Sequence, residues 1–155
     1  MSLERDIDLL RNVPFFDGIP SEALRLLAFS ADPRDYGDGA RLFSAGDVAE
    51  GGAIVIDGWI DLLDERENPP RVIERLGPGA LIGELALIVE TTRSVAALSN
   101  GRSRVLAVRR SLFRRMLEEY PSIAVTLHDR IAERLTSLSP VVGRIGADLA
   151  AIDRD

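Results

Sequence analysis

The stretch of residues 77–98 constrains this chain more than any other, because it places three glycines and a proline just before a short apolar run. Two of the glycines flank Pro78, and Gly83 directly precedes Glu84. A glycine can turn the backbone where a side chain would collide with a ligand. The residues after it can open one helical turn whose free amides point at a negative charge. The stretch therefore predicts a small anion-binding turn.

Arg93 follows this turn after a polar loop, and it supplies the positive charge that an anion requires. Its planar guanidinium presents a fork of donors that matches a phosphate better than the point charge of a lysine does. On residue types alone the stretch can also be a short apolar helix between two strands, with Gly83 kept for close packing and Arg93 at the surface. The residue types leave a choice between an anion site and ordinary packing.

The composition excludes several classes of function. With 155 residues and 46% hydrophobic content, the chain fits one domain with a real core. Its formal net charge of −6 argues against a broad grip on a nucleic-acid backbone, which needs basic residues clustered on one face. The absence of cysteine excludes disulfides, thiolate metal sites and cysteine nucleophiles. A single arginine can still serve one small anion.

No apolar run reaches the length that crosses a bilayer. The N-terminal residues, which include Glu4, Arg5 and Asp6, lack the charged-then-apolar layout of a signal peptide. We therefore expect a cytoplasmic protein without a membrane partner.

Between residues 34 and 109 the pattern predicts short strands separated by glycine, proline and acidic turns. The expected strands are residues 41–44, 53–56, 59–63, 71–76, 94–98 and 104–108. Gly58 predicts a tight hairpin turn, and residues 64–70 predict a solvated hairpin tip. Many short strands with regular punctuation favour a roll or a sandwich. Before them, residues 1–12 and the segment from Pro20 have helical patterns, with Ser2 a candidate cap of the first.

Helical patterns return at the C-terminal end of the chain. Ser111 is expected to cap a helix that runs to Glu119 and that Tyr120 and Pro121 close. A further helix then carries apolar side chains three or four positions apart, from Ile123 to Leu138. Such a stripe can pack on its own domain or pair with a second copy of itself. Pro140 should break or kink the helix and leave only a weakly helical tail.

The sequence Gly-Glu-Leu-Ala at residues 83–86, followed by Arg-Ser-Val-Ala at residues 93–96, resembles the phosphate-binding cassette of cyclic-nucleotide-binding domains. This is the family of bacterial catabolite activator proteins and of the regulatory subunits of cyclic-AMP-dependent kinase. Further similar segments follow in the family's order at residues 43–47, 54–58, 77–79 and 111–138.

The resemblance implies a mainly β fold, an antiparallel, jelly-roll-like β-roll with flanking N-terminal and C-terminal helices. It implies one cyclic-nucleotide-binding domain over residues 1–139, followed by the tail of residues 140–155.

The resemblance also implies a ligand, a cyclic nucleoside monophosphate such as cyclic AMP or cyclic GMP, and the residues that contact it. Those residues are Gly83, Glu84, Leu85, Ala86, Arg93, Ser94, Val95, Leu62 and Ile73. Arg93 would pair with the cyclic phosphate, helped by the amides of Leu85 and Ala86 and by the hydroxyl of Ser94. Glu84 would accept the ribose 2′-hydroxyl.

The base would lie between Leu62 and Ile73, under a lid near Leu138 and Ser139. The chain departs from the family at four positions. Ala80 stands where an acid is common, Leu81 where an aromatic is common, and Thr92 where a proline is common. Leu138 stands where a hydroxyl helps recognise the base. None of these departures removes a phosphate or ribose contact. Ser94 after Arg93 favours cyclic AMP over cyclic GMP.

We therefore expect a stand-alone regulatory domain that binds a cyclic nucleotide and relays binding through its C-terminal helices to an unknown protein partner. Homodimerisation through the C-terminal helix is a further expectation. Two alternatives are a protein-interaction module that has lost the ligand and the effector part of a catabolite-activator-like transcription regulator. Fewer than about twenty residues follow Pro140, too few for a helix-turn-helix module, so no direct DNA binding is expected.

A cupin-type enzyme is also a strand roll, but such a site usually needs several imidazoles. This chain has one histidine, His128, in the C-terminal helical region, and no convincing pair of nucleophile and base. We expect neither a metal nor enzymatic activity.

Overall fold

The computed structural model describes residues 3–136 of the 155-residue chain. The predictions for Ser2 as a helix cap, for the lid at Leu138 and Ser139, and for the tail from Pro140 lie outside the described residues. The described chain divides after Met116 into two compact units. The first contains all of the strands found in residues 3–136, and the second contains the end of α3 and the helix α4 (Pro121–Thr136).

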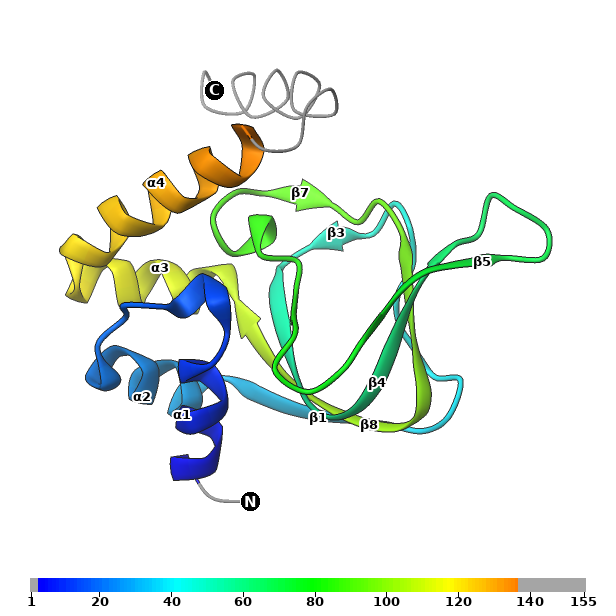
Figure 1. The fold of residues 1–155 in the computed structure, drawn as a ribbon, viewed down its shortest axis with the longest axis horizontal. Coiled ribbons are helices and arrows are strands. Elements are labelled where there is room, and N and C mark those ends of the chain that lie inside the picture. Colours follow the sequence, from blue (N-terminus) through cyan, green and yellow to red (C-terminus); the bar gives the residue numbers. More distant parts are fainter. Residues whose placement is uncertain (1–2, 137–155) are drawn as a thin grey trace. The chain divides into compact units, whose positions relative to one another are not determined.

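The sheet of the first unit is antiparallel and is built on two long strands, β4 (Gly51–Asp64) and β8 (Ala96–Arg109). The main path of the sheet has the order β1-β8-β4-β5, with β1 at Asp32–Tyr36 and β5 at Arg71–Leu76. Figure 1 shows β4 and β8 curving around the interior of the roll. The predicted antiparallel β-roll with flanking helices is confirmed.

Short strands complete the roll near the cassette. β2 (Arg41–Phe43) pairs with β8, and β6 (Leu81–Ile82) pairs with β4. β3 (Val48–Ala49) and β7 (Thr91–Thr92) form a separate two-stranded sheet. This small sheet brings the residues before β4 next to the residues before β8.

The hairpin turn predicted at Gly58 is wrong. Gly58 lies inside β4, which continues through it, and the pairing of β4 with β8 shifts register on both sides of Asp57. Its φ of +82° produces a bulge instead of a chain reversal. A Cβ at this position would meet the carbonyl oxygen of Arg102 and the Cα of Ser103, so only glycine fits here. The predicted strands 53–56 and 59–63 are therefore one strand, β4. The strands predicted at 94–98 and 104–108 likewise fall in one strand, β8, which begins only at Ala96.

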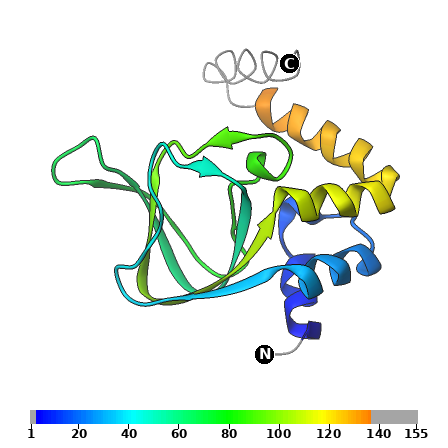
Figure 2. The same cartoon turned by 180° about the vertical axis from the view of Figure 1, so that it is seen from behind.

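Helices lie at one end of the strands in the first unit (Figure 2). α1 (Leu3–Arg11) and α2 (Ser21–Ser30) flank the short 3₁₀ turn η1 (Pro14–Phe16). The rings of Phe15 and Phe16 stack on Phe113 of α3, each with centroids 6.2 Å apart.

α3 (Arg110–Glu119) begins one residue before the predicted cap Ser111, because β8 runs directly into the helix. The backbone N–H of Arg110 donates to the carbonyl oxygen of Glu50 across the sheet, 2.8 Å away. Among the described helices, none combines the length and the apolar character that a membrane span requires.

The interior of the roll is packed with apolar side chains. Its buried cluster consists of Val55, Ile60, Ile82, Ala97 and Val105. Partly buried residues of the strands, among them Leu42, Phe43 and Leu62, pack against this cluster. The cluster fixes β2 and β4 in place, and these two strands border the site described next.

Candidate functional site

Arg93 is held at the end of β7 by its own backbone. Its N–H donates to the carbonyl oxygen of Asp47 at 2.8 Å, and its carbonyl oxygen accepts from the N–H of Gly46 at 2.8 Å. The register of the small sheet, Val48 opposite Thr92, continues this pairing. The Arg93 side chain therefore starts from a fixed point beside the β3 strand.

The guanidinium of Arg93 is partly buried, and the hydrogen-bond acceptor that it contacts is an uncharged carbonyl group. Its Nη2 donates to the carbonyl oxygen of Gly51 at 2.9 Å, and its Cζ lies 4.2 Å from the ring centroid of Phe43. Burial lowers the pKa of Arg93 from its ordinary value, and the nearby charge of Asp47 only partly opposes this shift. The side chain still carries its proton at neutral pH. A partly desolvated cation of this kind gains from an anion that can approach it.

Gly83 contacts this guanidinium directly. It adopts a φ of +76°, and a Cβ built on it would collide with Nη1 of Arg93. The structure thus brings together the glycine and the arginine of the predicted cassette, although ten positions separate them in the sequence. Any side chain at position 83 would displace the guanidinium.

The predicted helical turn after Gly83 is present as a 3₁₀ turn, η2 (Leu85–Leu87), with Glu84 in helical conformation before it. Within the turn, the N–H of Ala86 donates to the carbonyl oxygen of Gly83 at 3.1 Å. The N–H of Leu87 likewise donates to the carbonyl oxygen of Glu84 at 3.2 Å. Of the amides assigned to the phosphate, that of Leu85 takes no part in these bonds, whereas that of Ala86 would have to share its hydrogen bond.

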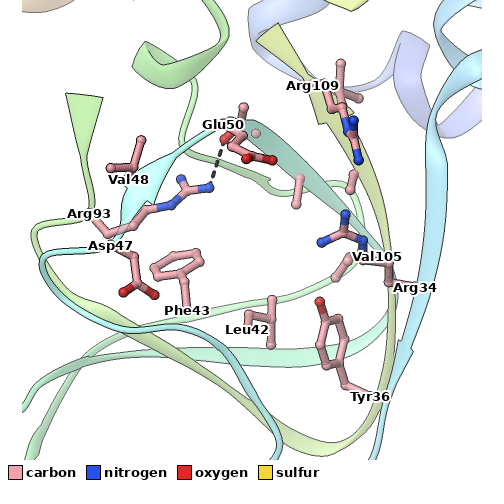
Figure 3. A pocket seen from close by; sticks show the side chains of 15 residues that line it. Arg34, Tyr36, Leu42, Phe43, Asp47, Val48, Glu50, Arg93, Val105 and Arg109 are labelled. Atoms are coloured by element: carbon pink, nitrogen blue, oxygen red, sulfur yellow. Dashed lines mark hydrogen bonds between the residues drawn. The ribbon is translucent and has the colours of Figure 1, made fainter. Parts of the chain in front are cut away.

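A cavity of about 210 Å³ opens beside Arg93. Figure 3 shows Arg93 and Phe43 on one side of it and Arg34, Tyr36 and Arg109 on the other. Arg34 is tied to Asp32, whose Oδ2 accepts from its Nε at 3.0 Å, and this bond raises the pKa of Arg34. The cavity therefore has cationic groups on both sides, and the carboxylates of Asp47 and Glu50 line it as well, together with apolar side chains.

Sequence reasoning missed Arg34, Tyr36 and Arg109. The first two lie on β1, which has no alternation of apolar residues to mark it, and Arg109 is the last residue of β8. Arg34 and Tyr36 are two positions apart, so in a strand both side chains lie on the same face. Only the pairing of β1 with β8 shows which face that is.

The other predicted contact residues lie elsewhere. Of the nine residues assigned to the ligand, all of them within the described chain, only Arg93 lines this cavity. Ser94 is exposed, Val95 is half-buried, and Leu62 packs against the core of the roll. Ile73 is 47% exposed and is the extra residue where the pairing of β4 and β5 shifts. The structure therefore does not gather Leu62 and Ile73 around the cavity beside Arg93.

His128 does not belong to a metal centre in the described part of the chain. Its Nδ1 lies 3.8 Å from Oδ1 of its neighbour Asp129, and its side chain is 83% exposed. Across residues 3–136, no group of three or more histidine, cysteine, aspartate or glutamate side chains is arranged to hold a metal ion.

Comparison with known proteins adds a family match and close structural likenesses. The family model described as cyclic nucleotide-binding domain matches residues 33–120. The cyclic AMP receptor protein of Thermus thermophilus is 28% identical over 127 residues, which cover 81% of this chain and 59% of that protein. This chain therefore spans less than two thirds of that receptor.

Among solved structures, a cyclic nucleotide-binding-like protein from Brucella abortus is 40% identical. It aligns with a TM-score of 0.68 over 73% of this chain and 97% of that chain. The N-terminal domain of a transcriptional regulator from Streptomyces coelicolor A3(2) is 26% identical, with a TM-score of 0.76 over 84% and 92% of the two chains.

Proposed function

The chain belongs to the cyclic nucleotide-binding domain family, and we propose that its cassette binds a cyclic nucleoside monophosphate as a regulatory ligand. The observation that carries the proposal is the direct contact between Gly83 and the guanidinium of Arg93. It supports the assignment because the glycine of the turn and the arginine, the two residues on which a phosphate site depends, lie next to each other. The resemblance seen in the sequence is confirmed at the level of the family.

The phosphate is the group that Arg93 is suited to hold. A cyclic phosphate carries one negative charge, which suits a partly buried guanidinium whose desolvation the charge of Asp47 only partly offsets. In the proposal, Arg93 gives up or shares its bond to Gly51 and donates to the phosphate, while the Leu85 amide and the Ser94 hydroxyl add further donors. In the proposal, the single negative charge of the phosphate offsets the positive charge of Arg93.

The sugar and the base are read by other residues in this proposal. Glu84, which directly precedes η2, accepts the ribose 2′-hydroxyl. Leu62, Ile73 and Val95 supply apolar contacts to the base. We favour cyclic AMP over cyclic GMP because of Ser94 and because the Thermus relative is named a cyclic AMP receptor.

The proposed output is regulatory and not catalytic. In the proposal, ligand binding is relayed through α3 and α4 to a protein partner, either a second copy of the chain or another protein. We place this regulation in the cytoplasm. A second candidate is the effector part of a transcription regulator, because the Streptomyces structure is the N-terminal domain of one. In either case we propose that the ligand-binding domain extends to residue 139.

Thermal melts of the full chain test the ligand assignment. A ligand present at about a hundredfold excess over its Kd should stabilise the folded state by ~2.7 kcal/mol. For a chain of this size that is a rise in Tm of roughly 5–10 °C. We expect this rise with cyclic AMP, a smaller one with cyclic GMP and with 2′-deoxy cyclic AMP, and none with linear AMP. Equal shifts for cyclic and linear AMP, or none for any nucleotide, would rule out the proposed function.

A further inference from the structure

Arg110, the first residue of α3, reaches back to the cassette turn. Its Nη1 donates to the carbonyl oxygens of Ala49 at 3.0 Å, Ala86 at 3.2 Å and Val89 at 3.3 Å. Ala49 ends β3, Ala86 lies in η2, and Val89 follows it in the segment that leads to β7. The guanidinium of Arg110 therefore joins the end of the cassette turn to the end of strand β3.

All three acceptors are backbone carbonyl oxygens, and two of them belong to buried residues. The last carbonyl groups of a helical turn have no partner inside the turn, and a cationic side chain near its C-terminal end satisfies them favourably. Ala49 and Ala86 are each only 1% exposed, so water has little access around two of the three acceptors. Removing the guanidinium would take a charged donor away from two buried carbonyl oxygens, which favours rearrangement of the turn.

The same residue is fixed to the sheet by its backbone. The N–H of Arg110 donates to the carbonyl oxygen of Glu50 at 2.8 Å, next to the Ala49 carbonyl that its side chain contacts. The start of α3 and the segment 86–89 are thus tied to one point on the loop between β3 and β4. A shift of that segment must lengthen the side-chain bonds or move the start of α3.

We propose that Arg110 is a positioning residue that holds the cassette turn in its ligand-binding conformation and couples the turn to the start of α3. The binding part of this inference rests on the proposed function, whereas the positioning part concerns the free protein. When the competent conformation of a turn is only fractionally populated, the apparent Kd rises by the inverse of that fraction. Coupling follows because the guanidinium that donates to the cassette turn belongs to the first residue of α3.

Hydrogen exchange of the free protein tests the positioning role. We expect Arg110→Ala to speed amide exchange in residues 84–90 and at the start of α3, while exchange in β5 stays unchanged. The matched control is Arg114→Ala, which removes an exposed arginine of the same helix and should leave the exchange of residues 84–90 as in the wild type. If Arg110→Ala does not fold, Arg110→Lys provides the same comparison, because lysine keeps the charge but lacks the planar fork. Wild-type exchange of residues 84–90 in a folded variant overturns the proposal.

Exchange and calorimetry with saturating cyclic AMP test the coupling. In the wild type we expect ligand-dependent protection in both residues 84–90 and the start of α3. In Arg110→Ala the protection should remain at the cassette and disappear from α3, and the Kd should rise about tenfold if one tenth of the turns remain competent. A merely stabilising residue would lower the Tm without separating the two segments. Absence of binding by the wild type would reject the proposed function, while the free-protein comparison would still decide the positioning role.

Discussion

Replacing Arg93 with alanine should weaken cyclic AMP binding by more than about tenfold. Truncating one partner of a buried charge pair costs roughly 2–5 kcal/mol, and each 1.4 kcal/mol is a factor of about ten in Kd. The loss should be large because the guanidinium is partly desolvated and its hydrogen-bond acceptor in the free protein is an uncharged carbonyl, that of Gly51. The Kd of Arg93→Lys should lie between those of the wild type and of Arg93→Ala, since lysine keeps the charge and loses the planar fork.

Isothermal titration calorimetry of the folded variants measures this effect. Arg114→Ala, an exposed arginine on α3, is the matched control for the loss of one positive charge and should bind as the wild type does. A folded Arg93→Ala variant that binds cyclic AMP with unchanged affinity would show that the phosphate is held elsewhere.

Replacing Gly83 with alanine should also weaken binding by more than about tenfold, although it removes no charge. The new Cβ would collide with Nη1 of Arg93 and force the guanidinium away from the turn. The φ of +76° adds strain, because a left-handed conformation costs roughly 1–2 kcal/mol in a residue that has a Cβ. We expect a fall in Tm of several degrees together with the loss of affinity.

Gly79→Ala separates strain from displacement. Gly79 has a φ of +90°, and, apart from Gly79 itself and its two chain neighbours, no residue has an atom within 4 Å of the place its Cβ would take. This variant should therefore lose a similar amount of thermal stability and keep its affinity for cyclic AMP. Melting curves and titrations of both variants make the comparison, and equal affinities in the two folded variants would contradict the role assigned to Gly83.

The sequence predicted the helices and several strands correctly where the structure of a segment depends on its own residues and not on distant partners. The turn after Gly83 and strand β5 follow from glycine placement and β propensity, and both are present. Gly58 and Gly101 both have positive φ values, which fit a hairpin turn and a bulge equally well. Only the pairing of β4 with β8 decides between them, and that pairing is not a local property.

Strand β1 shows the same limit. Its sequence Asp-Pro-Arg-Asp-Tyr contains no apolar alternation, and it is a strand because Asp32–Tyr36 pair along β8. β3, β6 and β7 are two residues long, too short for any period to appear.

The candidate site was predictable where its chemistry is contained in one motif. Glycine, glutamate and arginine in the order of the cassette pointed to Gly83 and Arg93, which lie in contact in the structure. Arg34, Arg109 and Arg110 were not predictable, because each reaches the site region from a strand or helix far away in the sequence. The assignments of Leu62, Ile73, Ser94 and Val95 to the ligand stay predictions.

A crystal structure of the chain grown with cyclic AMP is the most direct test of a phosphate site at Arg93. We predict the cyclic phosphate within hydrogen-bonding distance of the Arg93 guanidinium and of the Leu85 amide, with the ribose 2′-hydroxyl at Glu84. A complex in which Arg93 still donates only to Gly51, while the nucleotide lies away from Gly83 and Glu84, would contradict the account.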